Sequence, residues 1–273
     1  MWKCLLSALI LAATQLAAAE VRVAPGAGTL AGAIAGAAPG DVLVLTGGAY
    51  TGPVTIDRAL TIRGPREAVI EGAGRGTVIT ITASDVTLSG VTVTGSGHQN
   101  KDLDAGVKIL KGADRTRIEG LLLSENMHGV DVHGGRDSRV VGNEIIGTRA
   151  LHMNERGNGI YIWNSPGTLI EGNTIRYGRD GIFSNTSADS IYRGNLFRDL
   201  RFAVHLMYTR DTELSGNISI GNHLGYAIMQ SERPKLIGNL SLGDRDHGLA
   251  LNYANSADIS GNLVRGGTKK CLF

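Results

Sequence analysis

The chain has 273 residues, 39 of them glycine, and a formal net charge of +2 at pH 7. Hydrophobic residues make up 42% of the chain, which predicts a folded protein with a sizeable core and excludes a disordered one. The small net charge and the lack of any Lys/Arg block give no reason to expect nucleic acid as a partner.

Residues 1–19 are predicted to be a signal peptide. Lys3 supplies the positive start, residues 5–16 the apolar stretch, and residues 17–19 the small-residue cleavage site. The apolar stretch is too short to be a good membrane span, and no other membrane-spanning run occurs in the chain. We therefore expect an exported protein with no membrane span of its own.

Residues 20–64 are predicted to form an N-terminal cap, with an Ala-rich turn of helix followed by the first short strands. Such a cap covers the open end of a stack of repeats. The repeats themselves are expected over residues 65–273. The chain stops soon after a repeat and shows no C-terminal cap, which we interpret as a C-terminal truncation.

The repeat is marked by the pair Gly-Asn, which recurs at spacings of 30, 22, 22, 22 and 23 residues. A unit of about 22 residues with Gly/Asn corners predicts an all-β protein, a right-handed parallel β-helix in one elongated domain. We expect the Asn column to form a hydrogen-bonded ladder in the turn. The pairs are Gly142-Asn143, Gly172-Asn173, Gly194-Asn195, Gly216-Asn217, Gly238-Asn239 and Gly261-Asn262.

Alignment of the six units on Gly-Asn places apolar residues in the third, fifth and thirteenth positions of nearly every unit. The fourth and sixth positions flank an inward position, so they are expected to point outwards. The units span residues 128–143, 158–173, 180–195, 202–217, 224–239 and 247–262.

The predicted outer face carries His205, Met207 and Met229 on two consecutive coils. Met207 and Met229 fall in the same column, and His205 lies two residues from Met207 on the same face. Thioether and imidazole ligands together suit Cu(I) better than Ca²⁺ or Mg²⁺. The alternative interpretation is an exposed patch that a protein partner covers, with Tyr161, Trp163 and Phe183 as its aromatic part.

Two further His/Met pairs are weaker candidates for metal ligands. Met127 and His128 are adjacent, and His152 and Met153 lie in one of two coils that are longer by eight residues. Loops on a rigid scaffold often carry function. Ordinary packing of these loops is the alternative.

An enzymatic interpretation rests on Asp131 and His133. The segment HGVDVHGG at residues 128–135 is loosely similar to the Tyr-Gly-x-Asp-Pro-His-Asp motif of mannuronan C5-epimerases. Elimination or epimerisation of an acidic polysaccharide needs an acid and a base beside the sugar. The motif match is incomplete, because Val132 and Gly134 replace the Pro and the second Asp.

Several segments closely resemble the NosD family: the opening GDVLVLTGGAYTGPVTIDRALTIRG, the run LHMNERGNGIYIWNSPGTLIEGNTIRYGRDGIFSN, then FAVHLMYT, GNHLGYAIM and DRDHGLALNYAN. The family comprises periplasmic β-helix proteins that assist the maturation of nitrous oxide reductase in denitrification. The resemblance implies a non-enzymatic protein that works beside the permease and ATPase of an ABC transporter. It also implies copper delivery to nitrous oxide reductase, with a copper chaperone lipoprotein as donor.

Three functions thus remain open from the sequence. The first is a periplasmic accessory protein that handles copper, expected as Cu(I). The second is a polysaccharide lyase or C5-epimerase, and the third is an interaction scaffold that binds no metal.

Overall fold

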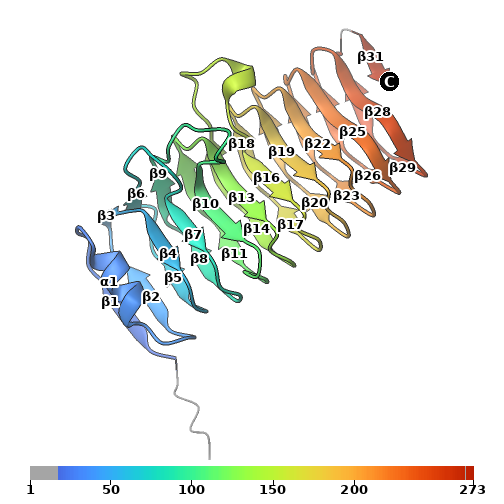
Figure 1. Ribbon diagram of the computed structural model, residues 1–273. Coiled ribbons are helices and arrows are strands. Elements are labelled where there is room, and N and C mark those ends of the chain that lie inside the picture. The colour runs from blue at the N-terminus through green and yellow to red at the C-terminus, as the bar shows by residue number, and fades with distance from the viewer. Residues whose placement is uncertain (1–17, 268) are drawn as a thin grey trace, which may run out of the picture.

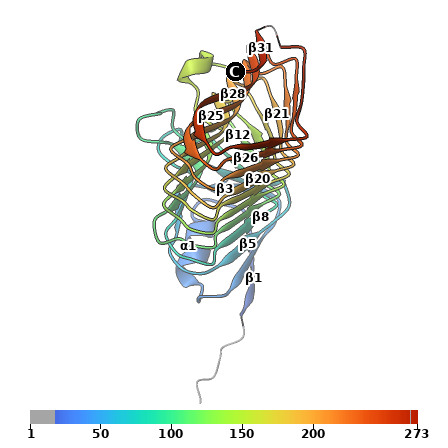
Figure 2. The same cartoon turned by 90° about the vertical axis from the view of Figure 1, so that its right-hand side faces the viewer.

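The computed structural model describes residues 18–267 and 269–273. The predicted signal peptide therefore lies almost entirely outside the described residues. Over the described part the chain winds into a stack of coils, and each coil contributes one short strand to each of three parallel sheets (Figure 1). The stack is elongated, and a view turned by 90° shows the coils superposed on one another (Figure 2). The predicted parallel β-helix is confirmed.

We name the three sheets A, B and C. Sheet A orders its strands as β1 (Glu20–Val23), β2 (Val42–Leu45), β5 (Thr61–Arg63), β8 (Thr87–Ser89), β11 (Arg117–Glu119), β14 (Arg139–Val141), β17 (Leu169–Glu171), β20 (Ile191–Arg193), β23 (Glu213–Ser215), β26 (Lys235–Ile237) and β29 (Asp258–Ser260). Sheet B comprises β3 (Gly48–Thr51), β6 (Ala68–Glu71), β9 (Thr92–Thr94), β12 (Leu122–Ser124), β15 (Glu144–Ile146), β18 (Thr174–Arg176), β21 (Leu196–Arg198), β24 (Ile218–Ile220), β27 (Leu240–Leu242) and β30 (Leu263–Arg265). Sheet C comprises β4 (Val54–Ile56), β7 (Ile79–Ile81), β10 (Ala105–Leu110), β13 (His128–His133), β16 (Ile160–Trp163), β19 (Asp180–Asn185), β22 (Phe202–Met207), β25 (Leu224–Glu232), β28 (His247–Asn255) and β31 (Lys270–Leu272).

The helices are short and few among the described residues. Helix α1 (Thr29–Gly36) buries Leu30 and Ile34 at the N-terminal end of the stack. A single 3₁₀ turn, η1 (Met153–Glu155), lies in one of the two longer coils. Strands from residues 20–63 already belong to the same three sheets as the later repeats.

The core is a column of apolar side chains that point into the coil. In sheet C the third repeat position places Val130, Ile160, Ile182 and Val204 in register, and each is fully buried. Alternation along a strand sends the flanking residues to the opposite face. The inward and outward faces of sheet C therefore follow directly from the repeat.

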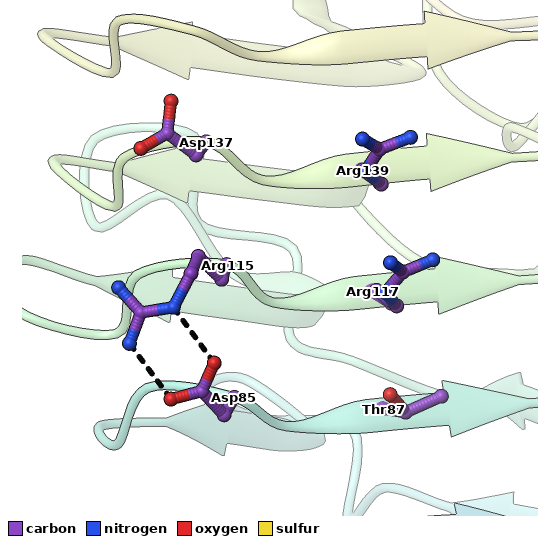
Figure 3. Close-up of a pocket in the computed structure, with 6 residues that line it drawn as sticks. All are labelled: Asp85, Thr87, Arg115, Arg117, Asp137 and Arg139. Atoms are coloured by element: carbon purple, nitrogen blue, oxygen red, sulfur yellow. Dashed lines mark hydrogen bonds and ion pairs between the residues drawn. The ribbon is translucent and has the colours of Figure 1, made fainter.

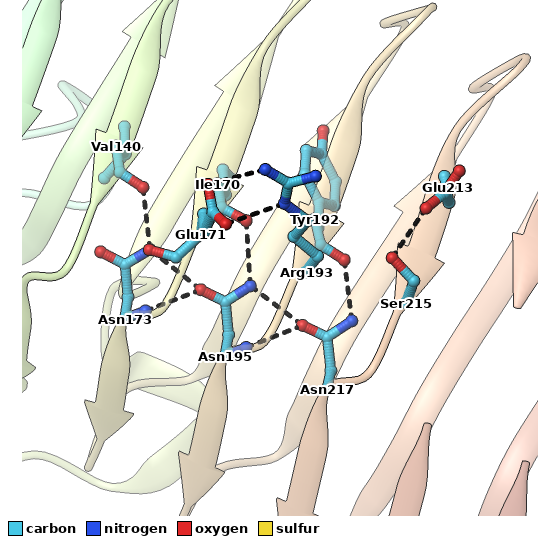
Figure 4. A network of polar contacts seen from close by, with 10 residues as sticks. All are labelled: Val140, Ile170, Glu171, Asn173, Tyr192, Arg193, Asn195, Glu213, Ser215 and Asn217. Atoms are coloured by element: carbon cyan, nitrogen blue, oxygen red, sulfur yellow. Dashed lines mark hydrogen bonds and ion pairs between the residues drawn. The ribbon is translucent and has the colours of Figure 1, made fainter. Parts of the chain in front are cut away.

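The predicted Asn ladder is present (Figure 4). Asn173 Nδ2 donates to Asn195 Oδ1 at 2.9 Å, and Asn195 Nδ2 donates to Asn217 Oδ1 at 2.9 Å. The same Nδ2 atom of Asn195 also donates to the Ile170 carbonyl, at 3.1 Å. Each buried amide thus ties its coil to both neighbouring coils and satisfies a turn carbonyl that water does not reach.

Six of the ten described strands of sheet C have a glycine next to or just before their first residue, at the corner where the chain leaves sheet B, whereas β22 has Ala203 at this position. At Gly181 a Cβ atom would lie 2.4 Å from the Phe197 ring and 2.5 Å from the Ala203 carbonyl oxygen. Only a residue without a side chain allows the coil to turn this tightly against its neighbour. The turn leaves Asp180, the residue before the glycine, at the outer corner of sheet C.

Candidate functional site

The candidate site is the outer face of sheet C, which we call the sheet C face. Two rows of side chains run along it, one residue per coil. One row is Lys108, Asp131, Tyr161, Phe183, His205 and Ala227, and the other is His133, Trp163, Asn185, Met207 and Met229. Equivalent positions in adjacent coils lie about 4.8 Å apart, as neighbouring strands do in any sheet.

An aromatic ladder occupies the middle of the sheet C face. The ring centroids of Tyr161 and Phe183 are 5.5 Å apart, and those of Phe183 and His205 are 4.8 Å apart. Trp163 stacks on the His133 ring at 4.5 Å and keeps 38% of its surface exposed. The predicted aromatic patch is therefore continuous across neighbouring coils, with Trp163 as its most exposed member.

His205 differs from its predicted placement, because it is buried and only 7% exposed. The residues at the adjacent corner cover it. Phe202 meets the imidazole edge-on at 5.2 Å, and Asp180 Oδ2 lies 3.2 Å from Nδ1. The expectation that the fourth column is exposed is thus wrong at His205, although the residue does lie on the outer side of the sheet.

Asp180 and Arg201 fix which nitrogen of the His205 ring donates a hydrogen bond. Arg201 donates to both carboxylate oxygens of Asp180, at 2.8 and 2.6 Å. Burial raises the pKa of Asp180, but the hydrogen bonds from His205 and Arg201 outweigh it and keep that pKa below its ordinary value. Asp180 is therefore ionised and accepts the Nδ1 proton of His205.

The other ring nitrogen of His205, Nε2, is buried and has no hydrogen-bond partner. In the neutral tautomer that donates Nδ1–H to a carboxylate, Nε2 carries the free lone pair. A carboxylate behind a histidine is the arrangement that orients the imidazole and increases its basicity as a metal ligand. His133 and His247 also have a buried ring nitrogen without a hydrogen-bond partner, but His205 combines this feature with a hydrogen bond from its other nitrogen to a buried carboxylate.

Met207 and Met229 lie opposite one another in register on β22 and β25, as predicted. Both side chains are partly exposed. Two residues of a strand separate His205 from Met207, or about 6.6 Å between Cα atoms, and one coil separates Met207 from Met229. Ala227 is the residue in register with His205 on the next coil. Its side chain is only a methyl group, which leaves space between the His205 and Met229 side chains.

The donor set on the sheet C face suits a soft metal ion. Within residues 18–267 and 269–273, no three His, Cys, Asp or Glu side chains come together in a way that could hold a metal ion. The thioethers of Met207 and Met229 are candidate ligands of another kind. One imidazole and two thioethers fit Cu(I) and do not fit Ca²⁺ or Mg²⁺.

His128 and Met127 are placed differently. Both are buried, and both His128 nitrogens are engaged: Nδ1 accepts the Asn158 N–H at 3.0 Å, and Nε2 lies 3.0 Å from Asn100 Oδ1. Burial lowers the pKa of His128 to about 4, so the ring is neutral at pH 7. This ring therefore has no nitrogen free to bind a metal ion.

His152 and Met153 line a hollow of about 500 Å³ together with Arg201, Phe202 and His223. Arg201 is also the residue that holds Asp180 behind His205. The hollow therefore shares Arg201 with the His205 cluster, by which we mean His205, Asp180, Arg201 and Phe202. The sequence prediction placed these two residues in a separate loop site.

Asp131 and His133 do not form an accessible catalytic pair. The Asp131 side chain is completely buried, with Lys108 Nζ 3.5 Å and His133 Nδ1 3.7 Å from its oxygens. Burial and the nearby Asp131 charge raise the pKa of Tyr161, which lies in the next coil. A carboxylate without solvent contact cannot touch a polysaccharide, so this arrangement argues against the lyase or epimerase interpretation.

Sequence reasoning missed Asp180, Arg201 and Phe202. These three residues lie at the corner before the positions that flank the inward residues, and the outward columns of the repeat do not include them. The signal was present in the sequence, because an acid stands before the glycine in RDGIFSN and an arginine at the same corner one coil later.

The fold and the surface define a parallel β-helix protein whose candidate site is an open sheet face. An alginate lyase from a Paenibacillus strain shares the fold, with a TM-score of 0.72 and 18% identity over 91% of this chain and 97% of that one. At this identity the likeness concerns the fold alone. No helix in the described part of the chain is both long and apolar enough to cross a membrane.

Residues 141–273 match the family described as NosD, periplasmic copper-binding protein. The probable ABC transporter binding protein NosD of Stutzerimonas stutzeri is 36% identical over 137 residues, which is 50% of this chain and 31% of that protein. The protein of the same name from Pseudomonas aeruginosa is 32% identical over 137 residues, or 50% and 32% of the two chains.

Residues 141–273 are therefore similar to NosD proteins, and the match spans about a third of the length of each curated relative. Both relatives are named as binding proteins, which agrees with the prediction that this chain is not an enzyme. Tyr161, Phe183, His205, Met207 and Met229 all lie inside the matched segment.

Proposed function

We propose that this protein is a periplasmic accessory protein that receives and passes on Cu(I) during the maturation of nitrous oxide reductase. It acts beside an ABC transporter, with a copper chaperone lipoprotein as the donor. The family description and the names of the curated relatives support the copper and transporter parts of this proposal. Copper is cargo in this scheme and not a resident cofactor.

We place the Cu(I) site at His205, Met207 and Met229. The observation that carries this proposal is the buried Nε2 atom of His205, which has no partner while Nδ1 is bound to Asp180. A buried polar atom without a partner costs about 1–3 kcal/mol, and a metal ion would offset that cost. Thioethers bind Cu(I) without an ionised side chain, so the bound ion stays easy to transfer.

The aromatic ladder gives the site a docking surface. Tyr161, Trp163 and Phe183 lie immediately beside the His205 cluster, and Trp163 is partly exposed. Exposed aromatic side chains are enriched where proteins bind one another. We therefore propose that the donor or acceptor of copper covers this ladder while the ion moves.

An anaerobic titration of the folded protein against a chromophoric Cu(I) chelator tests the site. The Met207→Leu, Met229→Leu and His205→Ala variants are each expected to lose at least tenfold in Cu(I) affinity. Met→Leu conserves volume, so the two methionine variants should fold normally, which thermal unfolding checks. Asn185→Ala, from the same row of the sheet C face, is the matched control and should bind as the wild type does. Unchanged affinity in all three site variants would refute this placement.

A further inference from the structure

A second surface of the molecule breaks the charge pattern of its own sheet. On the outer face of sheet A, Arg117 of β11 lies directly opposite Arg139 of β14. Every other pair of charged residues that face one another across strands of sheet A, within the described residues, has opposite signs. Those pairs are Glu171–Arg193, Glu213–Lys235 and Lys235–Asp258.

The two guanidinium groups also have unused donors. Among the described residues Arg139 has no side-chain hydrogen bond or ion pair, and Arg117 has only a long contact, with Nη1 3.4 Å from Glu119 Oε1. Like charges directly opposite one another on adjacent strands are destabilising. An oxyanion between the two guanidiniums would remove the repulsion and accept paired N–H donors.

The arginine pair lines a hollow of about 560 Å³ with Asp85, Thr87, Arg115 and Asp137 (Figure 3). Arg115 is already neutralised, because it donates to both oxygens of Asp85 at 2.7 Å. Three arginines and two aspartates leave a net charge of only +1 in the hollow. This balance favours a singly charged carboxylate over a doubly charged phosphate.

The same row becomes apolar in the next two coils. Arg139 is followed in register by Leu169 and then by Ile191, which is 38% exposed. At about 4.8 Å per coil, a carboxylate centred between the arginines lies about 7 Å from the Leu169 position and about 12 Å from that of Ile191. In an extended peptide, residues i+2 and i+4 lie about 7 and 13 Å from residue i.

We propose that Arg117, Arg139, Leu169 and Ile191 form a docking site for an extended segment of a protein partner. The segment presents a Glu or Asp carboxylate to the two arginines, and aliphatic side chains two and four residues later to Leu169 and Ile191. The docking site lies on a different sheet from the proposed Cu(I) ligands and does not depend on copper.

The test uses a fluorescent synthetic peptide of sequence Glu-Ser-Leu-Ser-Leu, blocked at both ends, and measures its anisotropy on titration with the full chain. A Gln-Ser-Leu-Ser-Leu peptide is the matched control and is expected to bind at least fivefold more weakly. Arg117→Gln and Arg139→Gln should each weaken binding of the Glu peptide by a similar factor. Arg193→Gln, whose arginine is paired with Glu171, should leave binding unchanged.

Two further readouts separate this proposal from a loss of fold and from the copper proposal. Arg139→Gln removes a like-charge contact, so its unfolding temperature should stay the same or rise. The same variant should bind Cu(I) as the wild type does. Equal binding of the Glu and Gln peptides would overturn the proposal, as would wild-type binding by both arginine variants. A competition experiment adds inorganic phosphate, an oligouronate or unlabelled Glu peptide to the bound fluorescent peptide. The proposal would also be overturned if phosphate or the oligouronate displaced the fluorescent peptide at a lower concentration than the unlabelled Glu peptide does.

Discussion

His128 and His205 lie on the same sheet but use their ring nitrogens in opposite ways. His128 accepts a backbone N–H at Nδ1 and contacts Asn100 at Nε2, so both nitrogens serve the fold. His205 gives Nδ1 to a buried carboxylate and leaves Nε2 without a partner. Two buried histidines thus divide into a structural residue and a candidate ligand by hydrogen bonding alone.

The neutral state of His128 predicts a loss of stability in mild acid. The unfolded chain takes up a proton on this residue below about pH 6.5. The folded chain resists until about pH 4, because its pKa is lowered to about 4 by burial. The free energy of unfolding should therefore fall as the pH drops through this window, by about 3 kcal/mol in total.

Urea unfolding at pH 7 and pH 4.5 measures the effect. His128→Gln should lose most of the difference between the two pH values, whatever its stability at pH 7. His98→Gln, at an exposed loop position, is the control and should keep the wild-type difference. A His128→Gln variant with the full wild-type pH dependence would contradict this account.

At the scale of the elements, the coils are held together by ladders more than by long strands, since many strands of sheets A and B have only three residues. The Asn ladder crosses six coils, from Asn143 to Asn262. Each amide from Asn143 to Asn239 accepts from the coil before it and donates to the Asn of the coil after it. The ladder therefore fixes the register of the stack at the turn between sheets A and B.

Asn195→Ala is expected to lower the free energy of unfolding by about 3 kcal/mol. The change removes the Asn195 side-chain partner of the Ile170 carbonyl and of the Asn173 N–H in a buried turn, while Asn173 Nδ2 keeps the Val140 and Glu171 carbonyls as acceptors. Asn252→Ala, at an exposed position of sheet C, should change stability by less than about 0.5 kcal/mol. Equal effects in chemical denaturation would show that the ladder does not hold the coils together.

The repeat predicted the ladder and the pairing of Met207 with Met229, because a coil of 22 residues and a side-chain period of two fix which residues share a column. The burial of His205 could not be predicted in the same way. It depends on Asp180 and Phe202 at a corner, whose side chains lie against the His205 ring. Contacts at corners require the three-dimensional course of the chain.

At the scale of the whole molecule, the solenoid keeps its two candidate surfaces on different sheets. The sheet C face carries the proposed Cu(I) ligands beside an aromatic ladder, and sheet A carries the arginine pair followed by aliphatic residues. A rigid stack presents both surfaces at fixed spacing. This arrangement suits a protein that holds a partner at one place while an ion moves at another.

X-ray absorption at the copper edge tests the central claim most directly. The protein is loaded anaerobically with one equivalent of Cu(I), and the wild type is compared with the Met207→Leu/Met229→Leu double variant. We expect two sulfur scatterers and one imidazole nitrogen in the wild type, and loss of both sulfur scatterers in the double variant. A first shell of nitrogen and oxygen only, or sulfur scattering that persists in the double variant, would contradict the proposed site.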